Sequence, residues 1–259
     1  MIDTKYFREY RNLLGFSNQN SAKSFFGAKD IHPSIDYQYI DNLNKRLKDI
    51  IIKLNSLVVE ELKVFDIDSF YQENIVSVFQ ILHENNILIR LNNQGRRKEE
   101  VYFSWMRGLV ISVFFQKAIS IIFGINENKI SIIGDDDLKN IENFKRTPKA
   151  DLELKVTENE KWRIEVQSGF QGINDVKQHK VLEAQRAKIE ENISSMVIHF
   201  DLFNGQVAFI QIDEIEEDSV NWITRQQMEG QTVFNIDQNY FIWKLTEQPP
   251  KFKDIVSLL

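Results

Sequence analysis

The chain has 259 residues, 42% hydrophobic and 27% charged, which is enough for one large globular domain or two small ones with a buried core. It contains no cysteine, which excludes disulfides, thiolate nucleophiles and cysteine-ligated zinc or iron–sulfur sites. The net charge of −6 argues against a protein that simply coats nucleic acid. It leaves open an enzyme that contacts phosphates through a local basic surface.

The N-terminal part, residues 1–94, is expected to be mainly helical and to serve in DNA binding or dimerisation. Apolar residues recur at helical spacing in residues 36–64 and 68–85, and residues 4–14 form a short amphipathic segment. Residues 18–35 carry Gly27, Pro33 and several Ser and Asn residues, so a loop is expected there. We expect neither a signal peptide nor a membrane-spanning stretch, and hence a cytoplasmic location.

Residues 95–259 are expected to form the core of an α/β fold, a mixed central β-sheet flanked by helices. The most hydrophobic helix is predicted at its start, and Glu99 and Glu100 suit a helix N-terminus electrostatically. Helices are predicted at residues 98–123, 175–192 and 220–228, and strands at 129–133, 151–156, 162–167, 196–200, 206–212, 233–236 and 240–244. Strands interspersed with helices in this order are typical of a mixed sheet.

Two carboxylates stand on the predicted strand pair 151–156 and 162–167, which a polar turn joins. Asp151 begins the first strand. Glu165 and Gln167 lie in the second, where a period of two directs both side chains to the same side. Two carboxylates brought together across a hairpin bind a hard divalent cation through oxygen, which is how metal-dependent phosphodiester cleavage is built. We therefore predict that Asp151, Glu165 and Gln167 form a catalytic site.

This segment resembles the PD-(D/E)xK nuclease superfamily and, within it, the type II restriction endonucleases. In that pattern an Asp in one strand is followed, in the next strand, by an acidic residue, any residue and a Lys. Asp151 matches the Asp, and Glu165-Val166-Gln167 matches the tripeptide with Gln in place of Lys. Pro148 lies three positions before Asp151 instead of directly before it. The resemblance covers roughly residues 99–200.

The resemblance implies an Mg²⁺-dependent endodeoxyribonuclease of a restriction-modification system, which cleaves double-stranded DNA at a short specific sequence as a homodimer. The metal would be held by Asp151, Glu165 and the backbone carbonyl of Val166, and Gln167 would orient the attacking water. Three alternatives stay open. They are a repair nuclease without sequence specificity, a catalytically inactive DNA- or partner-binding module on the same fold, and an unrelated cytosolic α/β protein.

A competing register of the motif also stays open. Glu153-Leu154-Lys155 is itself an E-x-K, and its partner acid would come from the acidic turn Asp135-Asp136-Asp137. We favour Asp151 with Glu165, because the competing register leaves the strand of Glu165 and Gln167 without a role. The simplest alternative to both is an exposed hairpin with ordinary surface charges.

Side chains that fork onto phosphates and base edges are candidates for DNA contact. They occur in the loop before the long helix, just before Asp151, and on the helix after the site. The candidates are Asn93, Gln94, Arg96, Arg97, Lys98, Lys149, Gln178 and Lys180, and Thr224-Arg225-Gln226-Gln227 is a further group. For each group the alternative interpretation is a solvated surface or a flexible polar loop.

Overall fold

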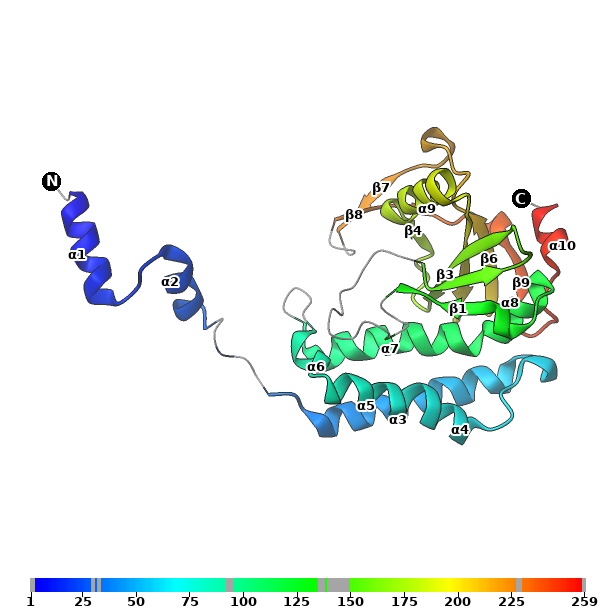
Figure 1. The fold of residues 1–259 in the computed structure, drawn as a ribbon, viewed down its shortest axis with the longest axis horizontal. Coiled ribbons are helices and arrows are strands. Elements are labelled where there is room, and N and C mark those ends of the chain that lie inside the picture. The colour runs from blue at the N-terminus through cyan, green and yellow to red at the C-terminus, as the bar shows by residue number, and fades with distance from the viewer. Residues whose placement is uncertain are drawn as a thin grey trace. The chain divides into compact units, whose positions relative to one another are not determined.

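The computed structural model describes residues 3–28, 31, 34–91, 96–134, 138, 150–226 and 230–257 (Figure 1). The chain forms two compact units, Met1–Asp36 and Tyr37–Leu259. The helices that follow residue 36 belong to the same unit as the β-sheet, whereas the sequence pattern predicts a boundary after residue 94. The predicted role of the N-terminal part in DNA binding or dimerisation stays a prediction.

The first unit contains two amphipathic helices, α1 (Thr4–Leu14) and α2 (Gln19–Phe26). The Asp3 side chain accepts a hydrogen bond from the Tyr6 amide at 2.9 Å and caps α1, and Asn18 caps α2 through the Ser21 amide at 2.9 Å. Neither helix contains a buried residue. The loop predicted for residues 18–35 is therefore wrong over α2, because the Asn18 side chain provides a helix start within a segment of loop-like composition.

The second unit begins with helices that pack against one another. In the contact between α3 (Tyr37–Leu57) and α7 (Lys98–Phe114), the buried Tyr102 hydroxyl donates to Asn44 Oδ1 at 2.6 Å. The helix predicted for residues 98–123 is interrupted at Phe115, where the chain bends by 43° into α8. The other elements of this part are η1 (Glu60–Leu62), α4 (Ile67–Tyr71), η2 (Gln72–Val76), α5 (Ser77–Glu84), α6 (Ile87–Arg90), α8 (Gln116–Phe123) and η3 (Glu127–Lys129).

Within the described ranges no single helix has the length and apolar character to cross a membrane. The bent pair α7 and α8 together meets the length and composition criterion, and much of its surface is buried against the rest of the unit.

A six-stranded mixed sheet forms the centre of the second unit. Its strand order is β1-β2-β3-β5-β6-β9, and every neighbouring pair is antiparallel except β3 with β5, which is parallel. Helix α9 (Gln178–Glu191) connects these two parallel strands. The strands are β1 (Ile130–Ile132), β2 (Leu152–Lys155), β3 (Lys161–Gly169), β5 (Ser194–Asp201), β6 (Gln206–Gln211) and β9 (Phe241–Lys244). The predicted fold class, α/β with a mixed central sheet and flanking helices, is confirmed.

A second, three-stranded antiparallel sheet has the order β4-β8-β7. It corrects two predictions. The helix predicted from residue 175 begins at Gln178, because Asp175–Lys177 pair with β8 as strand β4. The helix predicted for residues 220–228 is wrong where the chain is described, since the β-branched pair Ile223 and Thr224 lies in strand β7. The remaining elements are β7 (Ile223–Arg225), β8 (Gln231–Asn235), η6 (Glu217–Ser219), η8 (Gln238–Tyr240) and α10 (Phe252–Val256).

The two faces of the central sheet pack against different helices (Figure 1). On one face Phe115, between α7 and α8, stacks on Phe200 of β5 with ring centroids 4.0 Å apart. On the other face Val181 and Ala184 of α9 join a buried cluster with Val197 of β5. Successive strand residues point to opposite faces, so β3 separates an apolar side near α7 from a polar side that faces α9.

Candidate functional site

The β2–β3 hairpin brings Asp151 next to Glu165. The last ladder pair is Leu152 with Ile164, and one step further the Asp151 amide still donates to the Ile164 carbonyl at 3.1 Å. Asp151 Oδ2 accepts a hydrogen bond from the Val166 amide at 2.7 Å, so its carboxylate lies at the peptide that joins Glu165 to Val166. Leu152 and Ile164 are fully buried on the other face and hold the hairpin in this register.

Lys180, in the first turn of α9, reaches the same place. Its Nζ lies 2.7 Å from Glu165 Oε2, and the two side chains are only 16% and 12% exposed. Burial lowers the pKa of Lys180. The charge of Glu165, the hydrogen bond to it and the charges of Asp151 and Glu183 outweigh burial and raise that pKa above its ordinary value. Lys180 is therefore protonated at neutral pH, beside both predicted carboxylates.

The structure places the ammonium group of Lys180 beside Glu165. Its predicted contact with DNA stays a prediction. The family pattern has a lysine two positions after the acidic residue, where this chain has Gln167. Position 167 of β3 thus carries no charge, and the ammonium group beside Glu165 comes from Lys180 of α9. Lys180 lies 15 residues from Glu165 in the sequence, and no local pattern connects the two residues. They meet only because α9 crosses over the sheet after β3.

Gln167 faces strand β5. Its Oε1 lies 3.3 Å from Nδ1 of His199, and the other ring nitrogen, Nε2, lies 2.9 Å from Asn174 Oδ1. Burial lowers the pKa of His199, while the charges of Asp201 and Asp175 act in the opposite direction. The lowered pKa favours the neutral ring, in which one nitrogen donates and the other accepts, so the tautomer decides the direction of each contact.

Gly169 makes room for this arrangement. A Cβ atom at residue 169 would lie 3.0 Å from His199 Nε2, tighter than nine in ten real Cβ contacts, so the histidine ring would have to shift. The sequence alone does not select His199 as a candidate site residue. In the parallel pairing of β3 with β5, His199 is the partner of Gln167. The two residues are 32 positions apart in the sequence, so no local pattern predicts their contact.

In the competing register of the motif, the charged residues Glu153 and Lys155 form ion pairs away from Asp151 and Glu165. Glu153 forms an ion pair with Lys161 at 3.1 Å, and Lys155 pairs with Glu158 at 2.8 Å in the hairpin turn. The partner acids proposed for this register, Asp135, Asp136 and Asp137, lie outside the described residues.

Several of the predicted DNA contacts have partners within the protein. Arg97 lies with its Cζ 4.7 Å from the ring centroid of Tyr39 and forms an ion pair with Glu99 at 3.5 Å. Arg96 is exposed and donates to the Glu100 carbonyl at 3.5 Å. Lys98 and Gln178 are half-buried at the starts of α7 and α9. Asn93, Gln94 and Lys149 lie outside the described residues.

The second group of base-reading candidates includes Arg225. Its guanidinium donates to both carboxylate oxygens of the buried Asp175, at 2.9 and 3.3 Å. Its Nε and Nη2 atoms are therefore used within the small sheet, and Thr224 and Gln226 are the other described polar side chains of this group. Gln227 lies outside the described residues.

The described residues contain no group of three or more His, Asp, Glu or Cys side chains that could hold a metal ion. The candidate set is therefore smaller: the carboxylates of Asp151 and Glu165 and the carbonyl of Val166. All three provide hard oxygen donors, and Mg²⁺ is commonly held by one or two carboxylates with water and substrate oxygens as its other ligands. The chemistry of this set fits Mg²⁺.

No protein-family model matches the chain, and no curated protein matches it. Among solved structures, the chain is similar to the Holliday junction resolvase Hjc of Archaeoglobus fulgidus, with 10% sequence identity and a TM-score of 0.33. The match covers 55% of this chain and 96% of the resolvase.

Proposed function

We propose that this protein is a divalent-metal-dependent nuclease that hydrolyses phosphodiester bonds in DNA. The observation that carries the proposal is the convergence of Asp151, Glu165 and Lys180: Asp151 accepts from the Val166 amide of β3 at 2.7 Å, and Lys180 of α9 lies 2.7 Å from Glu165. Two carboxylates and a protonated amine, shielded from solvent but reachable, suit a reaction in which charge on a phosphate must be neutralised.

Asp151, Glu165 and the Val166 carbonyl would hold Mg²⁺. When bound, the ion would supply neutralisation of the phosphate charge and a lower pKa of water. The Asp151 carboxylate is oriented for this task by the Val166 amide, which donates to one of its oxygens. Glu165 is oriented by Lys180.

Lys180 would act as a cation and not as a general base, because its raised pKa keeps it protonated at neutral pH. Its ammonium group can donate to a phosphate oxygen and stabilise the negative charge that grows there during attack. In this role Lys180 would take over the function of the lysine that Gln167 replaces.

Gln167 would position the attacking water. Its Oε1 faces His199, whose ring is fixed from the other side by Asn174, so the side chain has one defined direction. Its Nε2 group then remains for a solvent or substrate oxygen. His199 and Asn174 would be positioning residues that act through Gln167.

The finer part of the proposal is type II restriction cleavage, in which a homodimer cuts both strands of duplex DNA at a short specific sequence. It is supported by the resemblance of the Asp151 and Glu165-Val166-Gln167 motif to that family. A twofold dimer would match a palindromic site. A repair nuclease without sequence specificity would use the same residues, and a cytoplasmic location stays an expectation.

The test is a plasmid digest. Supercoiled plasmid is incubated with the full-length protein and Mg²⁺, with EDTA in a parallel reaction and with Asp151→Asn as the control for contaminating nucleases. Discrete fragments support the restriction enzyme, and nicking or a smear supports the less specific nuclease. Absence of Mg²⁺-dependent cleavage by a folded protein, or full activity of Asp151→Asn, contradicts the proposed function.

A further inference from the structure

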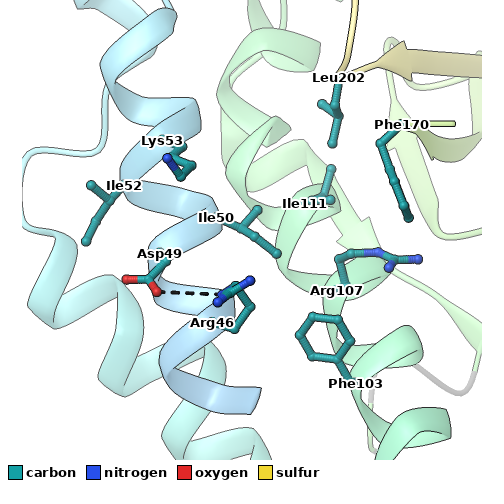
Figure 2. Close-up of a pocket in the computed structure, with 10 residues that line it drawn as sticks. All are labelled: Arg46, Asp49, Ile50, Ile52, Lys53, Phe103, Arg107, Ile111, Phe170 and Leu202. Carbon is teal, nitrogen blue, oxygen red and sulfur yellow. Dashed lines mark ion pairs between the residues drawn. The ribbon is translucent and has the colours of Figure 1, made fainter. Parts of the chain in front are cut away.

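A hollow of about 710 Å³ lies within the second unit, between α3, α7 and the chain segments that follow β3 and β5 (Figure 2). Its wall combines apolar and cationic side chains and includes Arg46, Ile50, Phe103, Arg107, Phe170 and Leu202. Asp49, the carboxylate of the lining, is ion-paired with Arg46 at 3.8 Å. Lys53 adds a further positive charge. The hollow is therefore cationic with apolar walls.

Arg107 lies between two aromatic rings of this hollow. Its Cζ is 4.7 Å from the ring centroid of Phe170 and 5.9 Å from that of Phe103, and Figure 2 shows the guanidinium beneath Phe170. Its Nε is buried and has no hydrogen-bond partner among the described residues. Burial, and then the charge of Arg96, lower the pKa of Arg107, and no carboxylate acts on it from the described part of the chain.

Arg107 is half-buried, and its buried Nε lacks a hydrogen-bond partner among the described residues, which costs free energy that a bound anion would recover. Arginine binds phosphate particularly well, because its planar fork matches two phosphate oxygens. Arg46 and Lys53 at the edge of the hollow add attraction for the same kind of ligand. The charge pattern therefore points to a phosphate group.

The apolar walls point to more than a phosphate. Phe170 is 44% exposed, and Ile50, Ile111 and Leu202 complete an apolar surface around it. A sugar–phosphate backbone alone gains little from such walls, whereas a nucleobase stacks on an aromatic ring whatever its sequence. The volume is also in the range of sites that enclose a small ligand.

Resting on the proposed function, we propose that this hollow binds an unpaired nucleotide of the DNA substrate, with its phosphate on Arg107 and its base against Phe170. Phe170 follows Glu165 by five residues, at most about 17 Å of extended chain. At about 3.4 Å of rise per nucleotide, a path of this length around the end of β3 spans about five nucleotides. The preferred substrate then has a single-stranded flap or gap there, and intact duplex bears the cost of extruding a base.

The test measures binding without catalysis, by fluorescence anisotropy in EDTA. One probe is a blunt duplex of about 20 base pairs, and the other is the same duplex with a single-stranded flap of about five nucleotides. The wild-type protein is expected to bind the flapped probe about 5- to 160-fold more tightly, the range that stacking of one base on an aromatic ring provides. Phe170→Ala and Arg107→Met are each expected to remove most of this preference.

The matched control is Phe65→Ala, which removes a fully exposed phenylalanine outside the hollow and should leave both affinities unchanged. Arg107→Lys keeps the charge without the planar fork, so it should keep part of the preference, and thermal melting of each variant shows that it folds. A flap of abasic nucleotides should weaken wild-type binding as much as Phe170→Ala does, and should have no further effect in that variant.

Three results would overturn this inference: equal wild-type affinity for the two probes, an unchanged flap preference in Phe170→Ala, or an equal loss for both probes in Arg107→Met. The last result would mean that Arg107 contacts only duplex phosphates. Because these assays contain no divalent metal, they separate the two proposals. If the protein digests plasmid but shows no flap preference, the proposed nuclease function stands and the nucleotide site is wrong. If it prefers the flapped probe but digests no plasmid, the nucleotide site stands and the proposed nuclease function is wrong.

Discussion

The two ends of the β2–β3 hairpin carry the same residue types in different surroundings. At the Asp151 end, Glu165 and Lys180 are 2.7 Å apart with side chains 12% and 16% exposed. At the turn end, Lys155 and Glu158 are 2.8 Å apart, with side chains 40% and 82% exposed. The separations are nearly equal, so distance alone does not distinguish a candidate site from an ordinary surface ion pair.

The difference lies in solvent and in neighbours. Water and salt screen the charges at the turn end, where an ion pair contributes little. At the other end a second carboxylate, Asp151, acts on the same lysine, and burial strengthens every charge interaction. An E-x-K tripeptide in the sequence is thus no guide to a site unless the fold adds a second acid and removes water.

The largest expected effect separates the two glutamates. Glu165→Gln should lower the cleavage rate by about 10³-fold or more, equivalent to about 4 kcal/mol of transition-state stabilisation, because a metal ligand and the partner of Lys180 are lost together. Glu153→Gln, on the neighbouring strand, should change the rate by less than about threefold. The measurement is the single-turnover rate of plasmid cleavage at saturating Mg²⁺. The competing register of the motif requires the reverse, inactivation by Glu153→Gln and tolerance of Glu165→Gln.

The next effect concerns the lysines. Lys180→Met should slow cleavage by about 10²- to 10³-fold, the loss seen when one preorganised donor to a developing negative charge is removed. Lys155→Met, which removes the lysine of the E-x-K, should leave the rate unchanged. Moving the lysine back to strand β3, as Gln167→Lys in the Lys180→Met background, should restore at least about tenfold of the lost rate.

The double variant tells more than Lys180→Met alone. If Lys180 served only the structure, a lysine at position 167 would not restore the cleavage rate. Thermal unfolding of both variants checks that the Glu165 carboxylate, left without its ammonium partner, does not unfold α9 from the sheet. If the double variant stays as slow as Lys180→Met while folding normally, Lys180 stabilises the structure without serving the reaction.

The sequence is sufficient for the hairpin and insufficient for the partners of its residues. Alternation of apolar residues predicts both strands and the side on which Asp151 and Glu165 stand, since a period of two is local information. Lys180 and His199 reach the site only because α9 crosses over and β5 pairs parallel to β3, which places them 15 and 32 residues from their contacts. No local pattern reports such contacts.

The wrong predictions have local causes. A single capping side chain, Asn18, starts α2 in a segment that composition assigns to a loop. The stretch around Ile223 has apolar spacing compatible with a helix, but pairing with β8 makes it a strand. In both places one interaction outweighs the average tendency of the segment.

A smaller effect concerns the histidine behind Gln167. Burial lowers the pKa of His199 below its ordinary value of 6.5, so the unfolded chain binds a proton more readily than the folded one. Stability should therefore decrease as the pH falls below about 6.5, down to the pKa of the folded state. His199→Gln should flatten this part of the profile. Urea unfolding between pH 5 and 8 measures it, and parallel profiles of wild type and variant would contradict the assignment.

The smallest expected effect belongs to the outer ion pair, Glu153 with Lys161. A double-mutant cycle of Glu153→Gln and Lys161→Met should give a coupling of about 0.2 to 1 kcal/mol at low salt, as for other partly exposed pairs. At about 1 M salt the Debye length falls to about 3 Å, so this coupling should vanish. The same cycle on Glu165 and Lys180 should keep most of its coupling, because their charges are shielded from the salt. Equal salt sensitivity of the two pairs would mean that burial does not set the Asp151 end of the hairpin apart.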